Sequence, residues 1–245
     1  ISLRTDNAFE TQSLSLFTSE SNLGSYKTLF TETSFLKWAW NSFIVAFVVT
    51  LTGVALASTS GYALSRFNFK GRQFGMLSLL TTQMFPATML LLPFFILLSK
   101  IGLINSYIGL IIIYSSTALP FCIWQMKGYY DTIPVSLEES ARLDGCNRFQ
   151  TFYKIILPLS KPALVITALF SFMSSWSEYV VAAIILQDPE LYTLPLGLKS
   201  FQASLATQWG LYAAGAVVVS IPVTILFISL AKYLVSGLTV GSVKG

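Results

Sequence analysis

The stretch NSFIVAFVVTLTGVALASTSGYAL, residues 41–64, contains no charged side chain. A helix needs roughly 20 mostly apolar residues to cross the ~30 Å hydrocarbon core of a bilayer, and this stretch is long enough. Four more apolar stretches follow it, near residues 74–99, 107–126, 163–186 and 211–235. The sequence therefore predicts an all-α, polytopic membrane helix bundle with about five spans.

The overall composition agrees with a membrane protein and excludes several other classes. Only 11% of the 245 residues are charged and 54% are hydrophobic, whereas a soluble domain carries about 25% charged residues. The 15 Lys and Arg residues form no dense basic patch of the kind that binds nucleic acid. The absence of histidine removes His-based catalytic triads and most zinc sites. Two cysteines, Cys122 and Cys146, cannot form a disulfide framework or a Cys-rich metal site.

Prolines fall inside several of the predicted spans, at positions 86, 93, 120 and 222. Each proline removes a backbone donor and bends a helix. A bilayer tolerates this where neighbouring helices or a wet cavity satisfy the freed carbonyls. Bent spans therefore favour a pathway protein over a simple anchor.

The distribution of cations predicts the orientation, because cytoplasmic loops carry an excess of Lys and Arg. Two connections are rich in cations: Arg66, Lys70 and Arg72 after the first span, and Lys127, Arg142, Arg148, Lys154 and Lys161 after the third. We therefore expect the loop 128–161 and the tail 237–245 in the cytoplasm, and the loop 187–210 outside. The spanning domain covers residues 38–236.

This orientation places the segment 1–37 outside the cytoplasm. The chain begins at Ile1, and no apolar run precedes residue 38. An external N-terminal segment needs a signal or a preceding helix, so we expect a further span upstream. A cleaved signal peptide is the alternative.

The predicted cytoplasmic loop contains signals for two short helices, which we call the knob (residues 133–158). Pro134 suits a first helical turn, the run 135–143 follows, and Gly145 is a natural stop. Asn147 can cap a second helix, which Leu157-Pro158 would end. The second helix carries an apolar stripe at helical spacing: Phe149, Phe152, Tyr153 and Ile156.

Charges on the first knob helix predict one internal pair and one unpartnered acid. Glu138 and Arg142 are four residues apart and can pair on the helix surface. Glu139 has no clear partner, although Arg142 could also reach it. An exposed carboxylate here suits a cationic site on another subunit, and a solvated loop charge is the alternative.

The spacing of this loop resembles a known family. Glu139-Ser140-Ala141, then Gly145, Ile155 and Leu157-Pro158, match the Glu-Ala-Ala signature loop in permease subunits of binding-protein-dependent ABC importers. The departures are Ser140 in place of Ala, and Cys146 where a small Ala is common. Both residues are small, so helix packing should survive.

The resemblance implies that the loop inserts into a cleft of a cytoplasmic ATPase subunit. Glu139 would then make the polar contact, Ala141 would allow close approach, and Gly145 would form the sharp turn. The residues assigned to this coupling site are Glu139, Ser140, Ala141, Asp144, Gly145, Ile155, Leu157 and Pro158. The chain itself contains no Gly-x-x-x-x-Gly-Lys-Ser/Thr motif. We therefore expect a non-catalytic subunit without cofactor, with ATP and Mg bound by the partner ATPases.

Further motifs resemble the carbohydrate-uptake branch of this family. They are Leu92-Pro93-Phe94, Gly102-Leu103-Ile104-Asn105, Leu119-Pro120-Phe121, Trp176-Ser177-Glu178-Tyr179, the external motif at 193–198 and the tail at 237–245. The tail resembles that of the smaller permease subunits of maltose transporters. The expected substrate is therefore an oligosaccharide, and an ABC permease for a different solute is the nearest alternative.

The same resemblance implies partners and a mechanism. The partners are a second, non-identical permease subunit, two copies of a cytoplasmic ATPase subunit and an extracytoplasmic sugar-binding protein, assembled in the bacterial cytoplasmic (inner) membrane among its lipids. Thr193, Leu194, Pro195 and Gly197 would contact the binding protein, and the tail would contact the ATPases. ATP binding would close the ATPases, pull the knob and rotate spans three to five.

Glu178 is the only acidic residue inside a predicted span. A charge at the centre of a bilayer costs about 2.5–3.5 kcal/mol on insertion scales, so it normally faces the bundle or water. It can hydrogen-bond sugar hydroxyls in a pathway or fix helix packing. Trp176 and Tyr179 can stack on a sugar or serve packing. One intramembrane acid without histidine gives little support to an ion-coupled transporter or a membrane-embedded enzyme.

Overall fold

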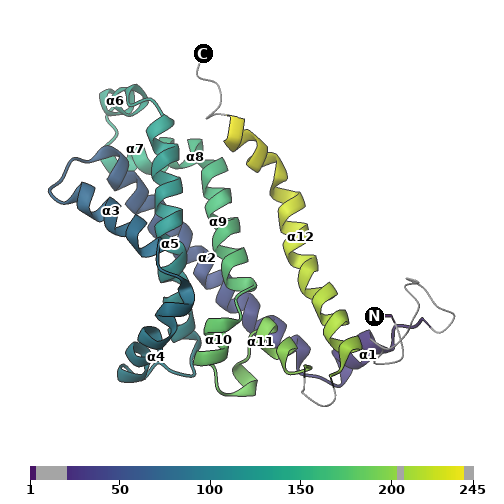
Figure 1. The fold of residues 1–245 in the computed structure, drawn as a ribbon. Helices are drawn as coiled ribbons and strands as arrows, with labels where there is room; N and C mark the ends of the chain where they lie inside the picture. Colours follow the sequence, from purple (N-terminus) through teal and green to yellow (C-terminus); the bar gives the residue numbers. More distant parts are fainter. Residues whose placement is uncertain (4–20, 203–206, 240–245) are drawn as a thin grey trace. The chain divides into compact units, whose positions relative to one another are not determined.

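A computed structural model describes residues 1–3, 21–202 and 207–239, and these residues form helices and connecting loops without a β-strand (Figure 1). The prediction of an all-α chain is confirmed. The chain divides into two compact units. The first unit contains Ile1–Ala46, Leu91–Leu110 and Ser175–Leu226, and the second contains Phe47–Leu90, Ile111–Ser174 and Phe227–Gly245.

Three of the predicted spans are single long helices. They are α2 (Phe35–Arg66), α5 (Tyr107–Thr132) and α12 (Trp209–Thr239), each long and apolar enough to cross a membrane. Helices α2 and α12 begin before the predicted boundaries, and α5 begins at Tyr107 as predicted but continues beyond residue 126. The apolar stretches do not include the polar and aromatic residues at these helix ends. Pro120 and Pro222 lie inside α5 and α12, which continue through them.

The other two predicted spans are broken helices. The stretch 74–99 divides into α3 (Arg72–Gln83), the 3-10 turn η1 (Ala87–Leu90) and α4 (Leu91–Lys100). Pro86 lies in the gap, where its missing N–H and its ring stop a helix. The stretch 163–186 divides into α9 (Lys161–Trp176) and α10 (Val180–Ile185). The prediction of a continuous fourth span is wrong at residues 177–179.

In the first unit, α2 begins against a segment from the far end of the sequence. This segment holds η3 (Pro189–Leu191) and α11 (Leu194–Lys199), and α1 (Gly24–Thr31) precedes α2. The Asn41 side chain donates to the carbonyls of Glu190 and Tyr192, both at 3.0 Å. A polar side chain of α2 thus satisfies carbonyl groups of η3 and of the residue that ends it.

In the second unit, the C-terminal ends of α2 and α5 lie together. The Ser65 hydroxyl donates to the Asp131 carboxylate at 2.6 Å. A Cβ added at Gly61 would come within 2.9 Å of Met126, so this glycine lets the two helices approach closely. The connections after α2 and α5 therefore leave at the same end, as their shared positive charge predicted.

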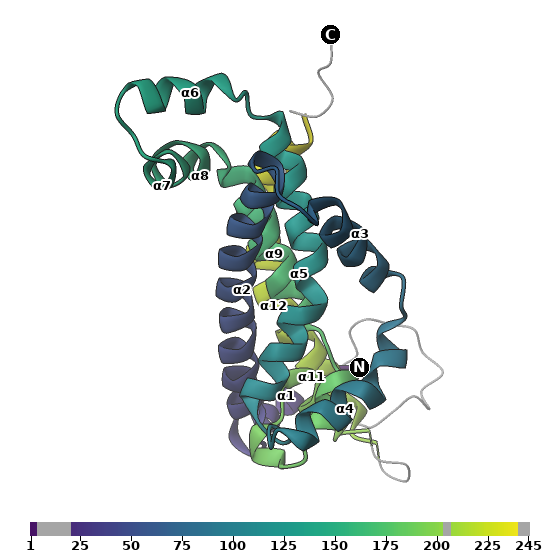
Figure 2. The same cartoon turned by 90° about the vertical axis from the view of Figure 1, so that its left-hand side faces the viewer.

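The knob is part of the second unit. It contains α6 (Ser136–Leu143), α7 (Arg148–Thr151), the π-helical turn η2 (Phe152–Ile156) and α8 (Leu157–Leu159), and Figure 2 shows it projecting from the ends of α5 and α9. The second knob helix ends at Leu159, two residues later than predicted at Leu157, and the chain then bends by 78° into α9.

Candidate functional site

The turn between the two knob helices has the geometry expected from its glycine. Gly145 has φ of 86°, a conformation that glycine adopts without steric cost. The Cys146 N–H donates to the Ala141 carbonyl at 2.9 Å, and the Gly145 N–H donates to the Arg142 carbonyl at 3.0 Å. These two bonds form a Schellman motif that ends α6. The prediction of a helix stop at Gly145 is confirmed.

The second knob helix begins with a capping box. The Asn147 side chain accepts from the Gln150 N–H at 2.9 Å, and the Gln150 side chain accepts from the Asn147 N–H at 2.9 Å. Both bonds satisfy donors that a helix start leaves unpaired. The prediction that Asn147 caps this helix is confirmed, and the two caps together make the knob locally stiff.

The predicted apolar stripe divides into an inward pair and an outward pair. Phe152 and Ile156 are buried in the core cluster of the second unit. Phe149 and Tyr153 are 73% and 65% exposed, and their rings stack in parallel with centroids 6.4 Å apart. The core covers only part of the stripe, so two of its four residues remain exposed to solvent. Leu143 at the end of α6 is also exposed, at 90%.

Glu138 is buried in the knob, whereas the prediction placed it on the helix surface; its predicted partner Arg142 does lie within ion-pair range. Its side chain is 1% exposed, and its carboxylate accepts hydrogen bonds from the Tyr62 hydroxyl at 2.7 Å and from Arg66. Arg66 also donates to the Ile133 carbonyl at 2.8 Å. Arg142 lies 4.0 Å from the same carboxylate, outside hydrogen-bonding distance.

Glu138 can be buried because Arg66 neutralises its charge and Tyr62 donates a hydrogen bond to it. A buried carboxylate is tolerated when it is paired and hydrogen-bonded. Tyr62 and Arg66 lie in the last turn of α2, so the network fixes α6 to that helix. Sequence reasoning missed both residues, because Arg66 was explained by the excess of cations in cytoplasmic loops. Glu138 and Glu139 are adjacent in the same short helix. The local sequence therefore gave no sign that the first is buried and the second exposed.

The residues predicted for coupling differ in their exposure. The outward-facing ones are Glu139, Ser140, Asp144, Gly145 and Pro158. Ile155 and Leu157 are partly buried, and Ala141 is buried, at 4% exposed. The close approach that Ala141 permits is therefore inside the chain, between the elements of the knob. Glu139 is exposed on α6, on the same knob as the outward aromatic pair.

The predicted pathway residues lie at the break between α9 and α10. The Trp176 side chain is buried, and its Nε1 donates to the Val219 carbonyl of α12 at 3.2 Å. The Glu178 carboxylate accepts from the N–H of Val181 at 3.0 Å and of Ala182 at 3.3 Å. Glu178, the residue before the N-cap Tyr179, thus satisfies N–H groups in the first turn of α10, a role that neither sequence interpretation included. These bonds explain why the chain can break here inside an apolar stretch.

A cavity of about 640 Å³ lies beside this break, within the first unit. Aromatic and hydrogen-bonding side chains line it: Trp176, Tyr179, Lys199, Gln202, Tyr212, Ser220 and Thr224. Lys199 donates to the Gln202 side chain at 2.5 Å. This combination of flat rings and polar groups suits an uncharged, hydroxyl-rich ligand. Trp176 and Tyr179 are thus brought into one site, and Glu178 does not line it.

The motif predicted to contact a binding protein forms helix α11 instead of an open loop. Thr193 and Leu194 are each 2% exposed, and the Leu194 N–H donates to the Ser42 hydroxyl at 2.7 Å. A Cβ added at Gly197 would lie 2.2 Å from the Trp38 ring. Pro195 lines the cavity. Contact with a second protein stays a prediction for this segment.

The C-terminal tail, 237–245, was predicted to contact ATPase subunits. Residues 237–239 end α12, and residues 240–245 lie outside the described residues. This contact also stays a prediction.

Comparisons with known proteins identify relatives along nearly the whole chain. The family described as "Binding-protein-dependent transport system inner membrane component" matches residues 50–240. The maltodextrin transport system permease protein MdxG of Bacillus subtilis (strain 168) is 38% identical over 94% of this chain and 83% of its own length. The galactooligosaccharides transport system permease protein GanQ of the same organism is 40% identical over 90% and 79%.

Solved structures support the same architecture. A crystal structure of a bacterial ABC transporter that imports the acidic polysaccharide alginate matches with a TM-score of 0.83 and 26% identity, over 95% of this chain and 87% of that one. The MetNI methionine ABC transporter matches with a TM-score of 0.61 and 16% identity, over 82% and 95%, which shows the fold alone.

Proposed function

Because the chain belongs to the binding-protein-dependent transport system inner membrane component family, we propose that it forms one half of the translocation pathway of an ATP-driven oligosaccharide importer. The chain is an integral membrane permease subunit of the ABC importer class. Relatives named for maltodextrin and galactooligosaccharides support an oligosaccharide as the substrate. A permease for another solute is the alternative.

The observation that carries this proposal is the surface of the knob. A stiff projection exposes an acidic residue, Glu139, and three apolar or aromatic residues, Leu143, Phe149 and Tyr153. Exposed apolar groups with a charged rim are typical of a protein contact site. The partner is a cytoplasmic ATPase subunit, into whose cleft the outward aromatic pair inserts while Glu139 contacts a cation. ATP and Mg bind to that partner, and this chain is non-catalytic.

The family description also supports the remaining partners. A second, non-identical permease subunit supplies the other half of the pathway, two ATPase copies lie below, and an extracytoplasmic sugar-binding protein delivers the substrate. The knob and the C-terminus face the cytoplasm of a bacterium, in accord with the cations that the connections after α2 and α5 share.

The cavity beside the α9–α10 break is the proposed sugar contact of this subunit. Tyr179 and Tyr212 offer ring faces, and Gln202, Ser220 and Thr224 offer donors and acceptors for hydroxyl groups. Closure of the ATPases pulls the knob, and the helices that follow it turn so that access to the cavity alternates. The bonds from Glu138 to Tyr62 and Arg66 extend this motion to α2.

The proposal is tested by changing the knob surface without changing its core. The importer with its ATPases is reconstituted in proteoliposomes, and maltodextrin uptake is measured together with ATP hydrolysis. Glu139→Lys reverses an exposed charge, and Gly145→Val strains the turn. We expect both to lower uptake per ATP hydrolysed at least tenfold.

The matched control is Glu32→Lys, which makes the same charge reversal at an exposed position at the end of α1. It should leave uptake unchanged. Normal uptake in both knob variants would refute the coupling role. If the wild-type importer coupled ATP hydrolysis to uptake of a different solute and did not take up maltodextrin, the substrate assignment would be refuted and the coupling role would remain.

A further inference from the structure

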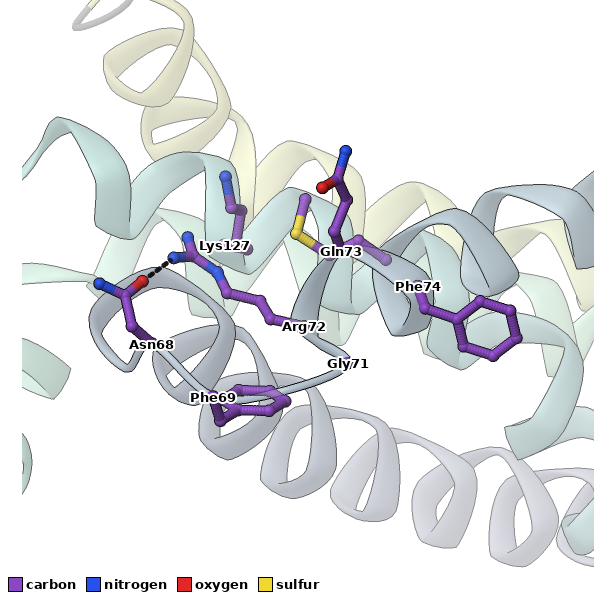
Figure 3. Close-up of a pocket in the computed structure, with 8 residues that line it drawn as sticks. Asn68, Phe69, Gly71, Arg72, Gln73, Phe74 and Lys127 are labelled. Carbon is purple, nitrogen blue, oxygen red and sulfur yellow. Dashed lines mark hydrogen bonds between the residues drawn. The ribbon is translucent and has the colours of Figure 1, made fainter.

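A second cavity, of about 600 Å³, lies in the second unit and shares no lining residue with the proposed sugar contact or with the knob. Its wall is formed by the turn after α2, the first turn of α3 and one residue of α5. Figure 3 shows the principal side chains around it, namely Asn68, Phe69, Arg72, Gln73, Phe74 and Lys127.

The cavity carries a positive charge that no carboxylate neutralises. The Arg72 guanidinium donates to the neutral Asn68 side chain at 2.8 Å, which holds it in place (Figure 3). In the part of the chain that the structure describes, no ion pair involves Arg72 or Lys70. Lys127 is different, because it pairs with Asp131 at 2.6 Å. The uncompensated charge is therefore that of Arg72, with Lys70 beside it in sequence.

The start of α3 adds to this positive potential. Gly71 is the N-cap of α3, with φ of 90°, and it brings no side chain to cap the first turn. A Cβ added there would meet nothing within 4 Å, so the position opens onto free space. The N-terminal end of a helix carries a partial positive charge that favours an anion. Together with Arg72, this end of α3 suits a phosphate group.

The position of the cavity along the spans identifies the source of that phosphate. The cavity lies at the end of α2, whose last residue is Arg66, and near the end of α5, which finishes at Thr132. In a bilayer this is the depth of the lipid headgroups. Phe69 and Phe74 are 50% and 77% exposed at the same place. A soluble phosphate would leave these rings in water, whereas a phospholipid covers them with its acyl chains.

We propose that this cavity binds an anionic phospholipid, with the headgroup phosphate on Arg72 and the first turn of α3. Basic pockets at the cytoplasmic ends of membrane helices are suited to anionic headgroups, and each cation near the surface contributes about 1 kcal/mol. The site does not depend on the transported solute or on the coupling role of the knob.

The test measures lipid binding to the full-length chain in its purified complex. The delipidated complex in detergent is titrated with phosphatidylglycerol or with zwitterionic phosphatidylcholine, and bound lipid is counted by native mass spectrometry. We expect wild type to prefer phosphatidylglycerol. Arg72→Gln should weaken its binding about fivefold, which corresponds to about 1 kcal/mol for the lost charge.

Lys161→Gln is the matched control, because it removes an exposed cation of the same unit that does not line the cavity. It should leave phosphatidylglycerol binding within twofold of wild type. Equal losses in the control and in Arg72→Gln would overturn the proposal, as would an unchanged affinity in Arg72→Gln. Displacement of the lipid by millimolar inorganic phosphate would assign the site to free phosphate instead. Equal binding of the two lipids by wild type would overturn it even if the variants fail to fold.

Discussion

The buried carboxylate of Glu138, on α6, accepts a hydrogen bond from Arg66, the last residue of α2. The two residues are 72 positions apart in sequence, and their side chains are 1% and 10% exposed. The next residue, Glu139, is exposed. Two adjacent acids of one short helix therefore have different physical roles: one fixes the knob to the bundle, and the other remains available to a partner.

Removing the buried acid should destabilise the protein far more than removing the exposed one. Glu138→Ala leaves the Arg66 charge buried without its partner, which typically costs about 3–5 kcal/mol. Glu139→Ala removes a solvated charge and should change stability by less than about 0.5 kcal/mol. Thermal unfolding midpoints of the two variants, measured in the same detergent, check this difference.

The cost of Glu138→Ala should also depend on Arg66. In Arg66→Ala the unpaired charge is the carboxylate, and in the double variant neither charge remains. The double variant should therefore lose less stability than the sum of the two single variants, with a coupling of about 0.5–3 kcal/mol. Additive losses would show that the two side chains do not act as a pair.

The knob turn gives a prediction about backbone conformation alone. Gly145 has a positive φ, and a Cβ added there would meet nothing within 4 Å. Any cost of substitution thus comes from the backbone, at about 1–2 kcal/mol for a β-branched residue. Gly145→Val should lower the unfolding midpoint and uptake, whereas Gly145→Asn should keep most of both, because Asn tolerates this conformation. If Gly145→Asn were as defective as Gly145→Val, the turn would not tolerate any side chain, whatever its backbone preference.

Local signals in the sequence were sufficient for much of this site. The stop at Gly145 and the cap at Asn147 depend on residues within a few positions of each other, and the three long helices follow from hydropathy over about 20 residues. The burial of Glu138 depends on a partner 72 positions away. No pattern inside the loop could distinguish it from Glu139.

The broken fourth span shows a different limit. Hydropathy predicted one continuous helix over 163–186, because a single polar residue such as Glu178 changes the apolar character of about 20 residues very little. The break occurs where the Glu178 carboxylate competes for backbone N–H groups and starts a new helix. Likewise, α11 was predicted as a loop because its contacts with Trp38 and Ser42 lie about 150 positions away.

Gly197 should be intolerant of any side chain. A Cβ at this position would lie 2.2 Å from the Trp38 ring, which is 6% exposed and held by a hydrogen bond from its Nε1 to the Pro189 carbonyl. Gly197→Ala therefore forces a shift of packed groups, and such overpacking costs about 1–3 kcal/mol. Gly75→Ala is the control: Gly75 lies in α3 with nothing within 4 Å. The control should be neutral or stabilising by up to about 1 kcal/mol, and an unchanged midpoint in Gly197→Ala would contradict the packing seen here.

Variants at Glu178 and Tyr179 should distinguish a role at the start of a helix from a role in sugar contact. The Glu178 carboxylate accepts from Val181 and Ala182, whereas Tyr179 lines the cavity. Glu178→Ala should lower stability by about 1 kcal/mol, similar to the usual cost of a lost helix cap, with the KM for maltodextrin uptake within twofold of wild type. Tyr179→Ala should leave the unfolding midpoint nearly unchanged and raise KM about tenfold, as expected for a lost contact of about 1.4 kcal/mol.

Glu178→Gln keeps an acceptor oxygen, so it should recover part of the stability. A tenfold rise in KM for Glu178→Gln at an unchanged midpoint would instead place this carboxylate in contact with the sugar, and its role at the start of α10 would then be secondary.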